Sequence, residues 1–134
     1  MAERIELEVV TPERAMVSEQ VTDVQVPGED GYLGILPGHA PLLSLLGAGA
    51  LSYANGGARR FLAVQGGLVE VLPGQVRVLA TLAERAEDID IARARADLER
   101  AQQEMHAATT RDASLAALEA VALAQARIAA AERK

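Results

Sequence analysis

Cysteine is absent from this sequence, and aromatic residues are few. Without cysteine the chain can form neither a disulfide framework, nor a thiolate nucleophile, nor a cysteine-based zinc site. The aromatic residues are Phe61, Tyr32 and Tyr53, so a core must be built from aliphatic and alanine side chains. A length of 134 residues suggests one domain, or one domain with an appendage. Half of the residues are hydrophobic, so a real core is possible.

Basic residues are also scarce. The formal net charge is -6, and the only lysine is Lys134. A protein that binds a phosphate backbone needs a basic stripe, usually with aromatic platforms for stacking. We therefore expect no nucleic acid partner and no binding to an anionic membrane surface.

Long hydrophobic runs are missing as well. The most apolar window, 41–51, is interrupted by Ser44, Gly47 and Gly49, and it is far shorter than the roughly 20 residues that span a bilayer. The first ten residues carry charges where a secretory signal would need an apolar run. We expect no targeting peptide and no direct membrane insertion, so that any membrane association comes through a partner.

Catalytic and metal-binding motifs are not found. His39 and His106 lie in different halves of the sequence, and neither has a second histidine at ligand spacing. There is no Gly-x-Ser-x-Gly elbow and no glycine-rich loop that ends in Lys-Ser or Lys-Thr. We predict neither a catalytic site nor a metal site, and the simplest interpretation of His39 is a turn residue that bonds nearby backbone.

Up to about residue 81 the hydrophobic pattern has a period of two. Near the start, for example, Ile5, Leu7 and Val9 alternate with glutamates. Such runs are typical of strands. The segments VPGEDG, LPGHAP, ANGG, VQGG and LPGQ separate them as predicted turns. Many short strands with frequent turns predict a sandwich or a flattened barrel.

After Glu84 the period changes to that of a helix. No glycine or proline occurs from Leu82 onward, and TTRD separates two alanine-rich segments. This pattern predicts two helices, the second beginning near Ala113, that pack as an antiparallel hairpin. The predicted apolar faces are Ile91, Ala94, Leu98, Ala101, Met105 and Ala108 on the first helix, and Leu115, Leu118, Val121, Ala124, Ile128 and Ala131 on the second.

The alanine content of this hairpin has an energetic consequence. Alanine is the best helix former, yet it buries little apolar area at about 25 cal/mol per Å². The helices are therefore expected to be stable while their docking is weak, so that the hairpin can rearrange without unfolding.

Four segments occur in an order and at a spacing that resemble one known family. They are VVTPER, GYLGILPGHAPL from Gly31, FLAVQGGLVEV from Phe61 and AERAEDIDIARARA from Ala83. With the two-helix tail, they resemble the epsilon subunit of the F-type ATP synthase of bacteria and chloroplasts over essentially the whole chain. LGILPGHAP is the most specific of these signals.

The resemblance implies a non-catalytic subunit of the central rotor stalk. It implies a two-sheet antiparallel β-sandwich at 1–85 and an antiparallel two-helix hairpin at 86–134. The sandwich would contact the gamma subunit and the c-subunit ring. The hairpin would lie folded on the sandwich or extend into the alpha/beta catalytic head and inhibit ATP hydrolysis. The subunit would help couple proton flow to ATP synthesis, as a peripheral membrane protein on the cytoplasmic face of the bacterial cell membrane.

The resemblance also implies a c-ring-facing loop at 29–39. Its candidate residues are Glu29, Asp30, Gly31, Tyr32 and His39. Tyr32 stands where many family members carry an acid, and Asp30 beside it would supply the charge instead. The alternative is a rigid connector, because the glycines and prolines of this segment suit a turn.

In some bacterial members the folded hairpin binds ATP through an Ile-Asp-x-x-Arg-Ala signature. Here the implied nucleotide-binding residues are Glu84, Ile89, Asp90, Arg93, Ala94, Arg100 and Arg127. Arginine offers a planar fork of donors to phosphate oxygens, and ATP would be a regulatory ligand rather than a required cofactor. A further arginine expected on the second helix is replaced by Leu123.

The same charges have a structural alternative. Five residues at three-four spacing would form a ladder of intrahelical ion pairs, each worth about 0.2–0.5 kcal/mol, and would satisfy both arginines without a ligand: Asp90, Arg93, Asp97, Arg100 and Glu104. At the level of function, the alternative to a stalk subunit is a free-standing ATP-sensing module that binds nucleotide through the hairpin.

Overall fold

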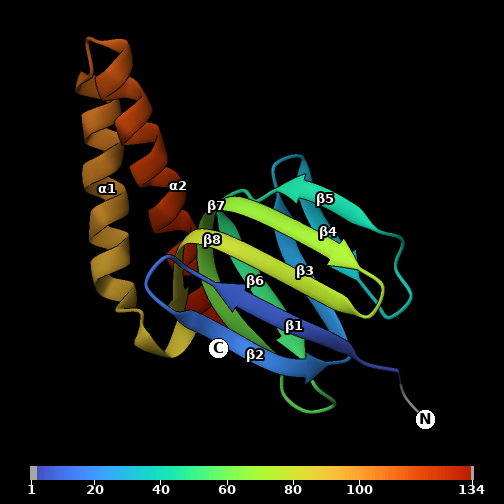
Figure 1. The fold of residues 1–134 in the computed structure, drawn as a ribbon. Coiled ribbons are helices and arrows are strands. Elements are labelled where there is room, and N and C mark those ends of the chain that lie inside the picture. The colour runs from blue at the N-terminus through green and yellow to red at the C-terminus, as the bar shows by residue number, and fades with distance from the viewer. Residues whose placement is uncertain (1–2, 134) are drawn as a thin grey trace.

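The computed structural model describes residues 3–133 and shows eight strands followed by two helices (Figure 1). This order confirms the predicted fold class. The strands are β1 (Ile5–Val10), β2 (Ala15–Val21), β3 (Asp23–Gly28), β4 (Gly31–Ile35), β5 (Leu42–Leu45), β6 (Gly49–Ala54), β7 (Arg60–Leu72) and β8 (Gln75–Arg85). A 3-10 turn, Ala86–Asp88, leads into α1 (Ile91–Ala107) and α2 (Arg111–Arg133).

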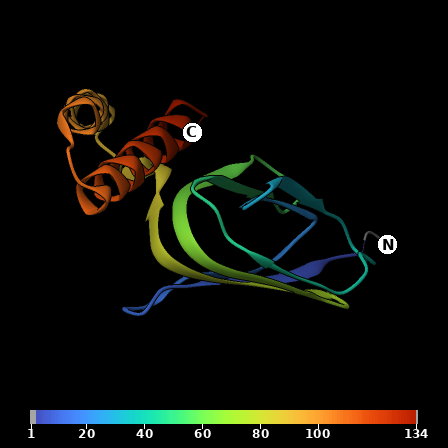
Figure 2. The same ribbon diagram turned by 90° about the horizontal axis from the view of Figure 1, so that it is seen from above.

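The strands form one sheet that folds over on itself into two layers. Its order is β2-β1-β8-β7-β6-β3-β4, and β5 also pairs with β7. The long strand β7 belongs to both layers, because its first part pairs with β6 and its last part pairs with β5. Figure 2 shows β7 and β8 curving together around the end of the sandwich.

The bend in β7 lies at Gly66 and Gly67, where the sequence pattern predicts a hairpin turn. That prediction is wrong, since β7 continues through both residues and its antiparallel pairing with β8 passes from Gln65 opposite Leu82 to Gly67 opposite Ala80 without a turn. Their φ angles are 72° and 118°, a region that suits glycine. A Cβ at position 67 would lie 1.8 Å from the carbonyl oxygen of Leu79. The glycines therefore allow a continuous strand to turn the corner between layers.

One strand pair departs from the predicted antiparallel arrangement. β1 pairs with β8 in parallel, from Glu6 opposite Gln75 to Val10 opposite Leu79, whereas the other named pairs among residues 3–133 are antiparallel. A parallel pair needs a long crossover, and here the whole of β2 to β7 supplies it. The sequence period cannot distinguish the two directions, because both put side chains on alternate faces.

The core between the layers is aliphatic, as the composition predicts. Alternate residues of each strand point inward, which reproduces the period of two in the sequence. The largest fully buried side chains are Leu7, Ile35, Leu51, Leu62, Val9, Val21, Val24, Val26, Val64, Val69, Val71 and Val76.

A polar contact joins β2 to β6, which are not neighbours in the sheet. The Tyr53 hydroxyl donates to Glu19 Oε2 at 3.2 Å, and Asn55 Nδ2 donates to Glu19 Oε1 at 2.9 Å. Tyr53 is only 5% exposed. Burial raises the pKa of Tyr53 to about 12, and the charge of Glu19 adds to the rise.

This raised pKa predicts a loss of stability at high pH. An unfolded tyrosine loses its proton near pH 10, whereas folded Tyr53 keeps its proton up to its pKa of about 12. The free energy of unfolding should therefore fall as the pH rises from about 10 to about 12. Urea unfolding across this range should show a shallower fall for Tyr53→Phe than for the wild type. Equal slopes for Tyr53→Phe and the wild type would contradict the prediction.

The helical hairpin lies beside the sandwich and contacts it through α2. α2 packs on β6 and β7, and α1 packs mainly on α2, on its far side from the sheet (Figures 1 and 2). Small side chains make the interface with the sheet: Ala50, Ala63, Ala86, Ala126, Ala130 and Ala131, with Ile89. The weak docking expected of alanine therefore applies to this interface.

The ends of the helices differ slightly from the prediction. α2 begins at Arg111 because Thr110 caps it, its Oγ1 accepting from the Ala113 amide at 3.1 Å. The sequence pattern predicts Leu115 and Leu118 on the packed apolar face, but they are 48% and 54% exposed. The reason is that the first turns of α2 project beyond the sandwich (Figure 1).

α2 also has the length and composition of a membrane span, with 23 residues and a mean hydropathy of 1.3 over its most apolar window. Much of its hydropathy comes from alanine. Its second half packs on β6 and β7, and its Arg127 is paired with a sandwich residue.

Candidate functional site

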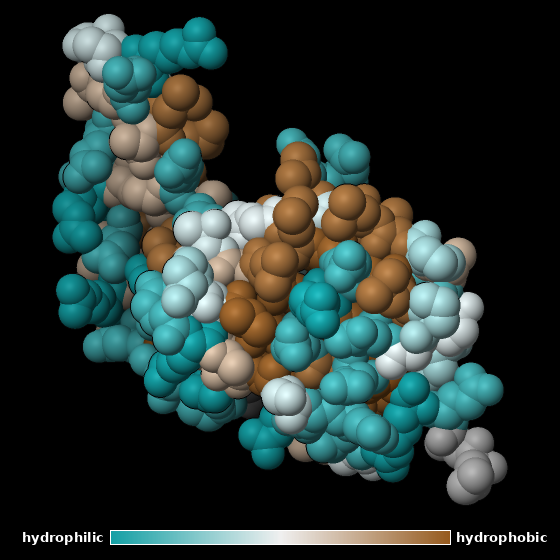
Figure 3. All heavy atoms as spheres, in the orientation of Figure 1, coloured by the Kyte–Doolittle hydropathy of each residue, from teal (hydrophilic) through white to brown (hydrophobic). Residues whose placement is uncertain are grey.

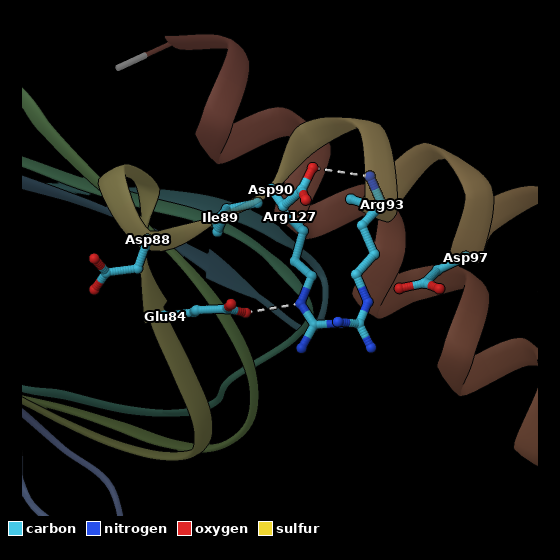
Figure 4. A pocket seen from close by; sticks show the side chains of 8 residues that line it. Glu84, Asp88, Ile89, Asp90, Arg93, Asp97 and Arg127 are labelled. Carbon is cyan, nitrogen blue, oxygen red and sulfur yellow. Dashed lines mark hydrogen bonds and ion pairs between the residues drawn. The ribbon is translucent and has the colours of Figure 1, made fainter.

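A pocket of about 330 Å³ lies where the sandwich meets both helices (Figure 4). β8 contributes Glu84, the linker after it contributes the next lining residues, and both helices contribute arginines. The lining residues are Glu84, Asp88, Ile89, Asp90, Arg93, Ala94, Asp97 and Arg127. All the nucleotide-binding candidates except Arg100 therefore come together here, although they are far apart in the sequence.

Three of these residues have structural roles. Asp90 is the N-cap of α1, and its Oδ1 accepts from the Arg93 amide at 3.1 Å. Ile89 and Ala94 are buried, Ile89 in the cluster between α2 and the sheet. They fix the start of α1 against the sandwich, and this placement directs the Arg93 side chain into the pocket (Figure 4).

Arg127 links the hairpin to the sandwich. Its Nε donates to Glu84 Oε1 at 2.7 Å, and both side chains are partly buried. Among residues 3–133 this is the one ion pair between the helices and the strands. Because Glu84 contacts only Nε, the terminal nitrogens of Arg127 remain directed into the pocket (Figure 4).

Arg93 makes no ion pair with any residue in the described part of the chain. Its guanidinium group points into the same pocket as that of Arg127 (Figure 4). Two guanidinium groups in one pocket repel each other, and an anion placed between them would remove this repulsion. The geometry therefore suits a phosphate or carboxylate group.

Arg100 is directed elsewhere. Its Nη2 donates to Asp97 Oδ1 at 2.5 Å, and it lines a separate recess of about 270 Å³ with Leu123. The predicted ladder of ion pairs is therefore correct for this pair alone among the described residues, since Asp90 caps the helix and Arg93 stays unpaired.

Asp88 and Asp97 line the pocket but were not among the candidate ligand residues. Asp88 lies between Glu84 and Asp90 in the sequence, so its proximity to the site could have been noted. The sequence predicts Asp97 only as an ion-pair partner of the arginines, because spacing alone cannot tell which arginine it binds.

The five c-ring-facing candidates do not form one loop. Glu29 and Asp30 make the tight turn between β3 and β4, and Gly31 and Tyr32 belong to β4. The Tyr32 hydroxyl accepts from the Ala50 amide at 3.0 Å. His39 lies in the exposed turn after β4, where its Nδ1 is 2.7 Å from the Ala40 carbonyl oxygen, as the simplest interpretation of this residue predicts.

A stripe of exposed leucines crosses the outer face of the sandwich. Leu45 of β5 lies opposite Leu68 of β7, and Leu68 lies opposite Leu79 of β8. Their exposed fractions are 53%, 38% and 44%. Leu36, Leu43 and Leu72 are further exposed leucines of the sandwich, and Figure 3 shows an apolar surface over this region. Contiguous exposed apolar side chains of this kind are typical of a surface that contacts another molecule.

Comparison with known proteins identifies the family. A profile described as "ATP synthase, Delta/Epsilon chain, beta-sandwich domain" matches residues 4–86. The ATP synthase epsilon chain of Solibacter usitatus is 56% identical over 134 residues, which is 100% of both chains. The chain belongs to the ATP synthase epsilon chain family. Another member, from Koribacter versatilis, is 48% identical over 105 residues, which is 78% of this chain and 74% of that protein.

Solved structures show the same fold at low sequence identity. A chain of the Euglena gracilis mitochondrial ATP synthase superposes with a TM-score of 0.82 at 22% identity, over 91% of this epsilon chain and 78% of that chain. A chain of the Tetrahymena thermophila mitochondrial enzyme, from a structure of its central stalk and c-ring, superposes with a TM-score of 0.65 at 16% identity, over 94% and 97%.

Membership in the epsilon chain family agrees with the prediction that the chain has no catalytic site. The epsilon chain is a non-catalytic stalk subunit of a membrane-associated ATP synthase complex. The pocket at Arg93 and Arg127 is therefore a candidate for regulation.

Proposed function

We propose that this epsilon chain is part of the central rotor stalk of a bacterial ATP synthase, on the cytoplasmic face of the cell membrane. Its sandwich docks on the gamma subunit and the c-subunit ring, and so helps to couple proton flow to ATP synthesis. The main observation that supports this proposal is the leucine stripe of Leu45, Leu68 and Leu79. Three exposed leucines in a row on a sandwich face require a partner that removes them from water.

Co-expression with the gamma subunit of the same organism tests the docking. We expect a stoichiometric complex that survives gel filtration. Failure to co-purify would overturn the proposal and would favour the free-standing ATP-sensing module instead.

The hairpin supplies the regulatory part of the proposal. In the folded state it is held to the sandwich by an alanine interface and the Arg127–Glu84 pair. Because this contact consists mainly of alanine side chains and one ion pair, α1 and α2 can undock, extend into the alpha/beta head and inhibit ATP hydrolysis. In a reconstituted head with gamma, the full chain should inhibit ATP hydrolysis more than a chain that ends after β8 does. Equal inhibition by both chains would contradict this role.

We further propose that the pocket between sandwich and hairpin binds regulatory ATP when the hairpin is folded. Arg93 carries this proposal, because it is unpaired among the described residues and faces a pocket that also holds the terminal nitrogens of Arg127. Phosphate oxygens accept bidentate hydrogen bonds from guanidinium groups.

Calorimetric titration of the isolated chain with ATP tests this site. Arg93→Ala should weaken ATP binding by about tenfold or more, since a hydrogen bond between charged groups contributes roughly 1.5–3 kcal/mol. Arg111→Ala is a matched control, because Arg111 lies at the first turn of α2, away from the pocket. If the wild type releases no heat with millimolar ATP, the nucleotide proposal fails while the stalk proposal stands.

A further inference from the structure

Two recesses lie side by side along the groove between the helices. The first is the pocket that holds Arg93, and the second, of about 270 Å³, holds Arg100 and Leu123. Asp97 and Arg127 line both recesses, so they form the boundary between them. Whether the two recesses act as one anion site or as two therefore depends on these residues.

Asp97 keeps Arg100 out of the first recess. The two side chains are hydrogen-bonded at 2.5 Å within one turn of α1. Asp97 is the more covered partner, since its side chain is 24% exposed and that of Arg100 is 65% exposed. Its negative charge faces both recesses, so it neutralises Arg100 and also repels any anion that extends from Arg93 toward Arg100.

The first recess alone offers little positive charge. Arg127 is already paired with Glu84, and Asp88 and Asp90 also line the pocket. Arg93 is the single arginine of the pocket without an ion pair among residues 3–133. Arg93 and the free nitrogens of Arg127 can hold one phosphoryl group, but a chain of phosphates would meet the carboxylate of Asp97.

We propose that Asp97 is a specificity-determining residue that limits recognition at this site to one phosphoryl group. The inference rests on the proposed nucleotide site and adds which feature of the ligand is recognised. The wild-type pocket responds to the presence of a phosphoryl group and discriminates little between nucleoside mono-, di- and triphosphates. Removal of the Asp97 charge joins the two recesses and lets Arg100 bind a second phosphoryl group.

The test compares the affinities for ATP and AMP in the isolated full chain. We expect the wild-type dissociation constants to agree within about threefold. Asp97→Ala and Asp97→Asn should each bind ATP about tenfold or more tightly than AMP, because one charge-assisted contact is gained. Both variants should remain folded, since the position lies on a helix surface and alanine favours helices. Circular dichroism checks this.

Glu99→Ala is the matched control. It removes one negative charge from the same helix, at an exposed residue that lines neither recess, and it should leave the ratio of ATP to AMP affinity unchanged. In the double variant Asp97→Ala, Arg100→Ala the preference for ATP over AMP should disappear, because Arg100 supplies the contact with the second phosphoryl group.

The outcomes separate this inference from the proposed function. If the wild type binds ATP and Asp97→Ala keeps the wild-type ratio, the role of Asp97 is refuted and the nucleotide site stands. If the wild type binds no nucleotide but Asp97→Ala binds tripolyphosphate through Arg100, the role of Asp97 stands and the nucleotide function fails. If neither protein binds tripolyphosphate or nucleotide, both are refuted.

Discussion

Replacing Gly67 by alanine should lower the free energy of unfolding by at least about 3 kcal/mol. The φ angle of 118° at this position is strained for any residue with a Cβ. The added Cβ would also lie 1.8 Å from the carbonyl oxygen of Leu79, a backbone atom of β8. The neighbouring strand would have to move, and this would break the paired corner on which both layers depend.

Gly34→Ala is the control for this substitution. Gly34 lies in β4, its φ angle is not positive, and no atom lies within 4 Å of the place that an added Cβ would occupy. Its free energy of unfolding should be unchanged or slightly raised. Urea unfolding followed by circular dichroism measures both variants. A Gly67→Ala protein as stable as Gly34→Ala would show that β7 does not need glycine to bend.

Replacing Leu68 by aspartate should weaken association with the gamma subunit by about a hundredfold or more. Leu68 is the middle residue of the leucine stripe, with Leu45 and Leu79 opposite it on either side. Central, desolvated residues contribute most to an interface, at about 2 kcal/mol or more each. A carboxylate buried there without a partner adds its own desolvation cost. The free chain should remain folded, since the side chain points outward.

Leu115→Asp controls for the chemical change. Leu115 is a similarly exposed leucine, but it lies on the projecting part of α2, outside the stripe. Biosensor measurement of gamma binding should show near wild-type affinity for Leu115→Asp and loss for Leu68→Asp. Equal affinities for both variants would place the gamma interface on another face of the molecule.

Much of the fold can be predicted from the sequence, because buried positions recur with the period of a strand or of a helix, and hydrophobic residues follow the same period. The alternation at Ile5, Leu7 and Val9 and the alanine stripes of the helices predict the sandwich and the hairpin. The parallel pairing of β1 with β8 could not be predicted, since strand direction leaves no trace in a pattern of period two. The bend at Gly66 and Gly67 was mistaken for a turn because both features use glycine in the same way.

The candidate site was predicted in part, and the partner of Asp97 was not predicted. Glu84, Arg93 and Arg127 do meet in one pocket, and the family resemblance supplied that grouping. Sequence spacing allowed Asp97 to bind either Arg93 or Arg100, because i,i+3 and i,i+4 neighbours are equally near on a helix. In the structure Asp97 pairs with Arg100.

β8 carries residues of both proposed binding surfaces on a single strand. Leu79 belongs to the leucine stripe, and Glu84 binds Arg127 at the pocket. An extended strand advances about 3.3 Å per residue, so these two positions are separated by at most about 17 Å of hydrogen-bonded backbone. β8 therefore forms a short, fixed connection: a rotor shaft bound at the stripe would carry Glu84, the sandwich side of the pocket, at a fixed offset, whichever position the hairpin takes.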